Sequence, residues 1–209
     1  MKNYICINGQ QIELTEEQVK QICAVKGQAE IKLADIPEGG TFKIGDHEFV
    51  VLEHSGDTTA IIRKELLSGD MEFGSNNNFS GSYVEGKCNE FAGEIATIVG
   101  DENLVEHTVD LTSDDGLKDY GTIKSRCSLL TTNLYRRYVE ILDKFKPDSW
   151  WWLATAHSTE RHSNSSWVKC VAPSGGIGSY SYINDYGVRP FCILKSTIFV
   201  SKKEEKENE

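Results

Sequence analysis

Hydrophobic and polar residues alternate over much of the first third of this chain. Such alternation predicts short strands that each bury one face. It covers residues 4–7, 11–14, 41–52 and 59–63. Asn8 and Gly9 separate the first two stretches and suit a tight hairpin turn, because both residue types tolerate positive φ. We therefore expect an N-terminal hairpin, followed later by two further strands.

Helical spacing of apolar residues begins at three points along the chain. Thr15 stands three residues before Gln18, and Ser82 stands three residues before Glu85, which is the spacing of a capping box. Gly100 is a typical residue to end the second helix. The apolar positions of the three predicted helices are Val19, Ile22 and Cys23; Val84, Cys88, Phe91, Ala92, Ile95 and Val99; and Leu134, Tyr138, Ile141, Leu142 and Phe145, the last set running up to Pro147.

Turn residues and charge divide the chain into three predicted parts. Residues 1–36 hold the hairpin and the first helix, and a Pro-Glu-Gly-Gly turn then begins the main domain, residues 37–200. Residues 201–209 are almost wholly charged, which is typical of a disordered tail. A chain of 209 residues suits one main domain of ordinary size with a small appendage.

Composition and charge narrow the classes of partner. With 39% hydrophobic and 26% charged residues, the chain is typical of a globular protein. The formal net charge of -10 disfavours nucleic acid and anionic membranes, because both repel an acidic surface. The sequence has no apolar run as long as a membrane span and no recognisable secretory signal. We expect synthesis in the cytoplasm without the usual export route and no insertion into a membrane; association with a virion is compatible with this.

Residues 150–194 carry the strongest functional signal. The anchor WWWL is followed by a polar segment rich in Ser, Tyr, Asn, Gly and His, and then by GVRPFCIL. Antibody-like binding surfaces favour such residues, because Tyr gives contact area at low entropic cost and Ser and Asn give adjustable hydrogen bonds. Strand alternation turns Trp167 and Lys169 outward and puts Tyr180 and Tyr182 on one face of a second segment. This pattern predicts a binding surface between two buried anchors.

The motifs WWWLATA and GVRPFCILKS resemble the C-terminal signature of prokaryotic and phage domains with a C-type lectin-like fold, which include the variable proteins of diversity-generating retroelements. The similarity extends over about residues 39–201. It implies an α+β fold, with a small twisted antiparallel sheet, two helices and a long loop-rich region that displays ligand-contacting residues. It also implies a phage or prophage origin, and in diversified members the hypervariable side chains are confined to the display region.

The resemblance assigns display or scaffold roles to individual residues. Trp167 and Lys169 join the predicted ligand-binding set as outward-facing strand residues. Neither they nor Glu160 can be reached from an Asn codon by adenine changes, so these positions are fixed or the chain is not diversified. The other display residues are His157, Arg161, His162, Ser163, Asn164, Ser179, Tyr180, Ser181, Tyr182, Asn184, Asp185 and Tyr186. The scaffold residues are Trp150, Trp151, Trp152, Leu153, Val188, Pro190 and Leu194, with Gly187 as a turn and Arg189 as a buried or half-buried hydrogen-bonding partner.

Metal and cofactor sites have little support in the sequence. Calcium-dependent lectins of the same fold carry Trp-Asn-Asp and Glu-Pro-Asn motifs, and Ile-Asn-Asp at residues 183–185 matches only part of the first. His157 and His162 lack the spacing of a helical zinc motif. The acidic stretch 110–121 lacks the spacing of an EF-hand and is predicted to be a solvated turn. We expect no metal and no cofactor.

Cys192 raises the alternative of an enzyme, because formylglycine-generating enzymes share this fold and use a cysteine near the C-terminal end of the domain. Alternation places Cys192 in phase with Val188, Pro190 and Leu194, which form an apolar row. That chemistry needs a second nearby cysteine, which we expect to be absent, since Cys170 is the only candidate in the sequence. We expect Cys192 to be an unreactive core thiol and the protein not to be an enzyme.

Together these features predict a non-enzymatic protein that presents a polar and aromatic surface to a protein or glycan ligand, with bacterial surfaces among the places to look for it. The alternative is a structural or assembly protein of a phage particle, in which the same region makes contacts within a virion. An oxidase that uses Cys192 comes third. The sequence identifies neither the ligand nor the oligomeric state.

Overall fold

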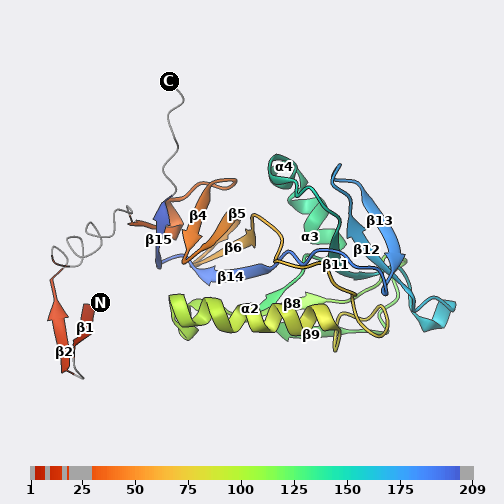
Figure 1. Cartoon of the computed structure of the whole chain (residues 1–209), viewed down its shortest axis with the longest axis horizontal. Helices are drawn as coiled ribbons and strands as arrows, with labels where there is room; N and C mark the ends of the chain where they lie inside the picture. Colours follow the sequence, from red (N-terminus) through yellow and green to blue (C-terminus); the bar gives the residue numbers. More distant parts are fainter. Residues whose placement is uncertain (1–2, 8–9, 16–17, 19–29, 203–209) are drawn as a thin grey trace.

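The predicted N-terminal hairpin is present in the structure. The computed structural model of the chain describes residues 3–7, 10–15, 18 and 30–202 (Figure 1). Strands β1 (Asn3–Ile7) and β2 (Gln10–Leu14) pair antiparallel. The first capping box is confirmed, because Gln18 N donates to Thr15 Oγ1 at 3.2 Å and Thr15 N donates to Gln18 Oε1 at 2.9 Å. The turn at Asn8-Gly9 and the helix predicted after Gln18 lie outside the described residues.

A curled eight-stranded sheet forms one end of the part of the chain from residue 30 onward (Figure 1). Its order is β10-β14-β6-β5-β4-β15-β3, with β7 also paired to β14, and the pairings are antiparallel. Residues 30–36 contribute to this sheet through β3, and Leu33 among them is fully buried. The strands are β3 (Glu30–Lys32), β4 (Thr41–Ile44), β5 (His47–Ser55), β6 (Thr58–Arg63), β7 (Leu104–Val105), β10 (Cys127–Ser128), β14 (Phe191–Lys195) and β15 (Phe199–Lys202).

The stretch 41–52 was expected to be one strand, and the structure shows instead two strands joined by a turn. Phe42 of β4 lies opposite Phe49 of β5, and Gly45 in the turn has a φ of 56°. Glycine adopts this left-handed conformation without the clash that a Cβ would cause. The single-strand prediction was wrong because Gly45 and Asp46 form a turn signal inside an otherwise alternating pattern.

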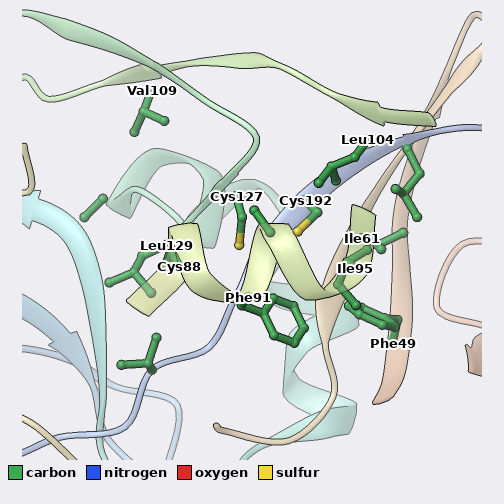
Figure 2. Close-up of a cluster of buried hydrophobic side chains, with 14 of the residues drawn as sticks. Phe49, Ile61, Cys88, Phe91, Ile95, Leu104, Val109, Cys127, Leu129 and Cys192 are labelled. Carbon is green, nitrogen blue, oxygen red and sulfur yellow. The ribbon is translucent and has the colours of Figure 1, made fainter. Parts of the chain in front are cut away.

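Helix α2 (Tyr83–Val99) confirms the second capping box and its apolar stripe. Ser82 Oγ accepts a hydrogen bond from Glu85 N at 3.1 Å, and Gly100 ends the helix with a φ of 91°. The helix runs along the large sheet (Figure 1), and its apolar side chains join the larger of two hydrophobic clusters (Figure 2). The cluster includes Phe49, Ile61, Cys88, Phe91, Ile95, Cys127, Leu129 and Cys192.

The third predicted helix is broken into short turns. It comprises α3 (Thr132–Arg137), α4 (Val139–Leu142) and a 3-10 turn (Asp143–Phe145). Tyr138 interrupts it with φ -105° and ψ 12°, and the Tyr138 hydroxyl donates to Glu53 Oε2 of β5 at 2.6 Å. The apolar spacing thus correctly predicted a helical region at these residues. The break at Tyr138 goes with its contact to the sheet, which the spacing alone does not show.

A second, three-stranded sheet lies at the other end of Figure 1, in the order β11 (Trp151–Ala156), β12 (Trp167–Val171) and β13 (Ile177–Ser181). Its two faces pack into different hydrophobic clusters: Trp152 belongs to the larger cluster and Trp151 to the smaller. A ribbon of β8 (His107–Asp110) and β9 (Thr122–Ser125) completes the strands. The fold is therefore α+β, with mostly antiparallel strands and few helices. No helix within the described residues is long and apolar enough to cross a membrane.

Candidate functional site

The tryptophan anchor is locked into the interior. Trp151 and Trp152 are 1% and 0% exposed. The Trp151 ring lies edge-on to Tyr135 with a centroid separation of 5.8 Å, and the Trp152 ring lies edge-on to Phe73 at 5.5 Å. Trp152 Nε1 donates to Met71 O at 3.0 Å. The strand that leads into the predicted display segment, residues 157–186, thus starts from a fixed point.

Arg189 fixes the opposite end of the segment. It is 1% exposed and, as predicted, forms buried hydrogen bonds. Its guanidinium donates to Arg63 O and Lys64 O at 3.0 Å and to Phe145 O at 2.8 Å, and it lies over the Trp151 ring at 5.2 Å. Burial lowers the pKa of Arg189 to about 10, so the side chain stays charged at neutral pH.

Asn77 holds the start of the display segment in place. Its side chain is buried, and Nδ2 donates to Ser158 O and Trp167 O at 2.9 Å each and to Asn164 O at 3.3 Å. Its Oδ1 accepts from the Tyr120 hydroxyl at 2.6 Å. Sequence reasoning missed this residue, because Asn77 is the middle of three consecutive asparagines and no pattern distinguishes it from its neighbours.

The acidic stretch 110–121, expected to be a solvated turn, packs against the display segment instead. Asp115 Oδ2 accepts from Ser158 Oγ at 2.7 Å and lies 3.0 Å from His162 Nδ1. Hydrogen bonds from Ser113 and Ser158 hold the pKa of Asp115 well below its ordinary value. The carboxylate is therefore ionised at neutral pH and helps to order the segment around His162.

Two further cationic side chains of the predicted surface are paired with this acidic stretch. Lys169 was expected to face solvent, but it is only 9% exposed, and Nζ lies 3.1 Å from Asp114 Oδ2. The other oxygen of Asp114 lies 3.5 Å from Arg136 Nη2 of α3. Arg161 forms an ion pair with Asp119. The predicted solvent exposure of Lys169 was thus wrong, because a carboxylate distant in sequence covers that part of the strand.

The β12–β13 pair divides the display residues between two faces. Trp167 lies opposite Ser181, and Ser179 is two residues from Ser181, so these three side chains point to one side; Tyr180 points to the other. His157 belongs to the Trp167 side, because its Nδ1 lies 3.3 Å from Ser179 Oγ and its ring centroid 6.3 Å from that of Trp167. The predicted surface therefore consists of two adjoining faces, which we call the Trp167 face and the Tyr180 face. They meet at the outer edge of β13.

The Tyr180 face is a cluster of aromatic rings. The Tyr180 ring lies 5.0 Å from Trp150 and 5.7 Å from Tyr186, and Tyr186 lies 4.6 Å from Trp152. Tyr180 is 40% exposed, whereas Tyr182 and Tyr186 are half-buried against the larger cluster. Of the three tyrosines expected at the surface, Tyr180 is the most exposed to solvent.

Exposed hydrophobic side chains gather in this region. Trp167 is 48%, Tyr180 40% and Ile183 60% exposed, and all three lie within 17 residues, at 167–183. In the described part of the chain the other large exposed hydrophobic residues are Tyr83, Ile98 and Phe199. Among the remaining display residues, Arg161, His162, Ser163 and Asp185 are exposed, and His157, Asn164, Ser179, Ser181 and Asn184 are half-buried.

A polar cavity of about 410 Å³ lies beside the Lys169–Asp114 pair, between β8, the acidic stretch and α3. Asp114 lines it, together with hydroxyl-bearing side chains. On its β8 wall, His107 Nε2 lies 2.9 Å from Ser128 Oγ. Burial lowers the pKa of His107 to about 4, so this imidazole is neutral at pH 7.

The cysteine arrangement differs from expectation. Cys192 is fully buried, as expected, but Cys127 lies directly opposite it across the β10–β14 pair, and Cys88 of α2 is close to Cys127 (Figure 2). The expectation that Cys170 is the only nearby candidate was therefore wrong. Burial raises the pKa of Cys127 well above its ordinary value. All four of these thiols are free and buried, and in the part of the chain that the structure describes no group of three or more His, Cys, Asp or Glu could hold a metal ion.

Comparison with known proteins gives one family match. A family described as a domain of unknown function, DUF6273, matches residues 105–196. This span runs from β8 to β14 and contains both the display segment and the acidic stretch packed against it. No curated protein matches, and no solved structure matches.

Proposed function

We propose that this protein recognises a macromolecular ligand, a protein or a glycan, through the Trp167 and Tyr180 faces and the turn that follows β13. In this proposal it is a binding protein and not an enzyme. The α+β architecture with its curled antiparallel sheet supports a scaffold of the C-type lectin-like class. The motifs WWWLATA and GVRPFCILKS support a relationship to phage and prophage display proteins.

The observation that carries the proposal is that three exposed hydrophobic residues lie on or directly after the small sheet: Trp167 on one face, Tyr180 on the other and Ile183 in the turn after β13. Complete burial of a large apolar side chain contributes about 1.5–3 kcal/mol, so leaving about half of each side chain in water forgoes part of that free energy. Exposed aromatic residues grouped in one place typically mark contact surfaces, and tryptophan and tyrosine are enriched among the residues that dominate binding energy.

Rigid support strengthens the proposal. The exposed rings stand on strands anchored by Trp151 and Arg189, both 1% exposed. The polar residues beside them are also held, since Asp115 and Asp119 bind His162 and Arg161. Side chains that are already ordered lose less conformational entropy when a ligand binds, so this arrangement favours recognition.

The test compares three forms of the full chain in a screen against glycan arrays and purified bacterial surface proteins. The first is the wild type, the second carries Trp167→Ala with Tyr180→Ala, and the third carries Phe199→Ala. Phe199 is a matched control, because it is 59% exposed but belongs to β15 in the large sheet, at the other end of Figure 1. We expect the double variant to bind any specific ligand at least tenfold more weakly, with the Phe199 variant unchanged. Equal binding by all three forms would show that the proposed surface does not bind the ligand.

A further inference from the structure

Two backbone hydrogen bonds set the phase of the β12–β13 pair. Tyr182 N donates to Ser166 O at 2.9 Å at one end, and Ala172 N donates to Gly176 O at 2.9 Å at the other. The register between these bonds is continuous. Opposite residues of an antiparallel pair alternate between hydrogen-bonded and non-hydrogen-bonded positions. The even-numbered residues of β13 therefore direct their backbone groups toward β12.

The odd-numbered residues of β13 direct their backbone N–H and C=O groups the other way, to the outer edge of the sheet. These residues are Ile177, Ser179 and Ser181. Ser181 O accepts from Asn184 N at 3.0 Å in the following turn. Among the described residues no other strand pairs with β13 on this side, and β13 stands at the end of its sheet (Figure 1). The edge thus offers unpaired donors and acceptors two residues apart.

The other strand edges of the large and small sheets are short, charged or covered. At the ends of the large sheet, β3 has three residues, of which Glu30 and Lys32 are charged, and β10 has two residues. The other edge strand of the small sheet, β11, is covered by hydrogen bonds such as that from Ala154 N to Leu130 O. Strand β13, Ile-Gly-Ser-Tyr-Ser, has five residues with no charge, no proline and no bulge against β12. It therefore lacks the features by which proteins usually prevent an edge from pairing.

We propose that the ligand is an extended polypeptide segment that joins the small sheet as a fourth strand beside β13. This inference rests on the proposed function and names its ligand class. An extended backbone presents N–H and C=O groups with the two-residue repeat that the edge requires, and sugar hydroxyls have no such repeat. The side chains of an added strand alternate between the two faces, so one set reaches Trp167 and the other reaches Tyr180. The segment carries apolar side chains at alternate positions, and it is neutral or basic, because the net charge of the chain is -10.

The experiment uses a displayed library of random 12-residue peptides, selected on the immobilised full chain. The affinity of the most enriched peptide is then measured by fluorescence anisotropy for the wild type, Ser179→Pro and Ser179→Ala. Proline removes the outward N–H at an edge position where the fold does not need it, whereas alanine keeps the N–H and removes only the hydroxyl. We expect Ser179→Pro to bind at least tenfold more weakly than Ser179→Ala, whose own change in affinity measures the contribution of the hydroxyl alone. A second measurement needs no variant: the peptide should slow amide hydrogen exchange at Ile177 and Ser179 of the wild type.

Each other outcome overturns the inference. Selection of no specific peptide, wild-type affinity in Ser179→Pro, or unchanged exchange at Ile177 and Ser179 excludes a polypeptide strand at this edge. Self-association of the wild type that Ser179→Pro abolishes, seen by sedimentation velocity, identifies a second copy of the chain as the occupant. If a ligand is lost with the Trp167 and Tyr180 substitutions but kept by Ser179→Pro, the proposed function stands and the strand-addition mode fails.

Discussion

Asn77 offers a sharp test of how the display segment is held. In Asn77→Ala, the peptide oxygens of Ser158 and Trp167 lose donors at 2.9 Å, and the Tyr120 hydroxyl loses its acceptor at 2.6 Å. Each such hydrogen bond contributes about 1 kcal/mol net. Because Asn77 is fully buried, water cannot replace the lost groups without rearrangement, and we expect the free energy of unfolding to fall by about 3 kcal/mol.

The assay is urea unfolding followed by tryptophan fluorescence, with amide exchange over residues 158–167 as a local readout. Asn76→Ala is the matched control, because it makes the same chemical change one residue away on an exposed side chain. Asn76 Oδ1 accepts from Asn78 N at 2.8 Å within the turn, so the control should lose about 1 kcal/mol or less. We also expect faster exchange in the segment for Asn77→Ala alone. Equal destabilisation by the two variants would refute the role given to Asn77.

Three further predictions concern groups around the site. Asp114→Ala should lower the free energy of unfolding by about 2 kcal/mol, because it leaves the buried Lys169 ammonium without its closest partner. Lys169→Met should cost less, because methionine removes the charge and keeps the apolar part of the lysine side chain. Equal shifts of the two variants in thermal unfolding would contradict this. Burial lowers the pKa of His107 from 6.5 to about 4, so on acidification the imidazole is protonated in the unfolded chain before it is protonated in the folded chain. The free energy of unfolding should therefore fall by up to about 3 kcal/mol as the pH drops from 6.5 toward 4. His107→Gln should flatten that part of the stability–pH profile, and an unchanged slope in urea titrations at several pH values would count against it. Because Cys192 is buried, we expect it to react with a maleimide at neutral pH only as fast as the protein unfolds locally. Mass spectrometry of the peptide that contains Cys192 measures this rate, and rapid labelling of the native protein would restore the oxidase alternative.

Local signals in the sequence accounted for much of the fold. Ser82 and Gly100 marked the two ends of α2 because caps depend on residues within one turn of each other. The hydrogen-bonding role of Arg189, just before β14, was also predicted from the resemblance of the GVRPFCILKS motif, and the structure buries its side chain with three backbone carbonyl partners. The strand at Trp167 followed from alternation over five residues.

Contacts between distant segments could not be predicted in this way. Lys169 is buried because Asp114, 55 residues earlier, reaches it, and neither residue type signals that pairing. Cys127 lies opposite Cys192 only because β10 and β14 become neighbours in the folded sheet. The division of the surface into Trp167 and Tyr180 faces likewise depends on the register of β12 against β13, which is a property of the assembled sheet.

The most direct test of the recognition surface is hydroxyl-radical footprinting of the full chain, free and saturated with the ligand that the screen identifies. Mass spectrometry then reports how strongly each exposed side chain is oxidised. We expect oxidation of Trp167, Tyr180 and Ile183 to fall several-fold on binding, while Phe199 and Ile98, which are also exposed, stay unchanged. Unchanged oxidation of Trp167 and Tyr180, with protection elsewhere on the molecule, would contradict the account.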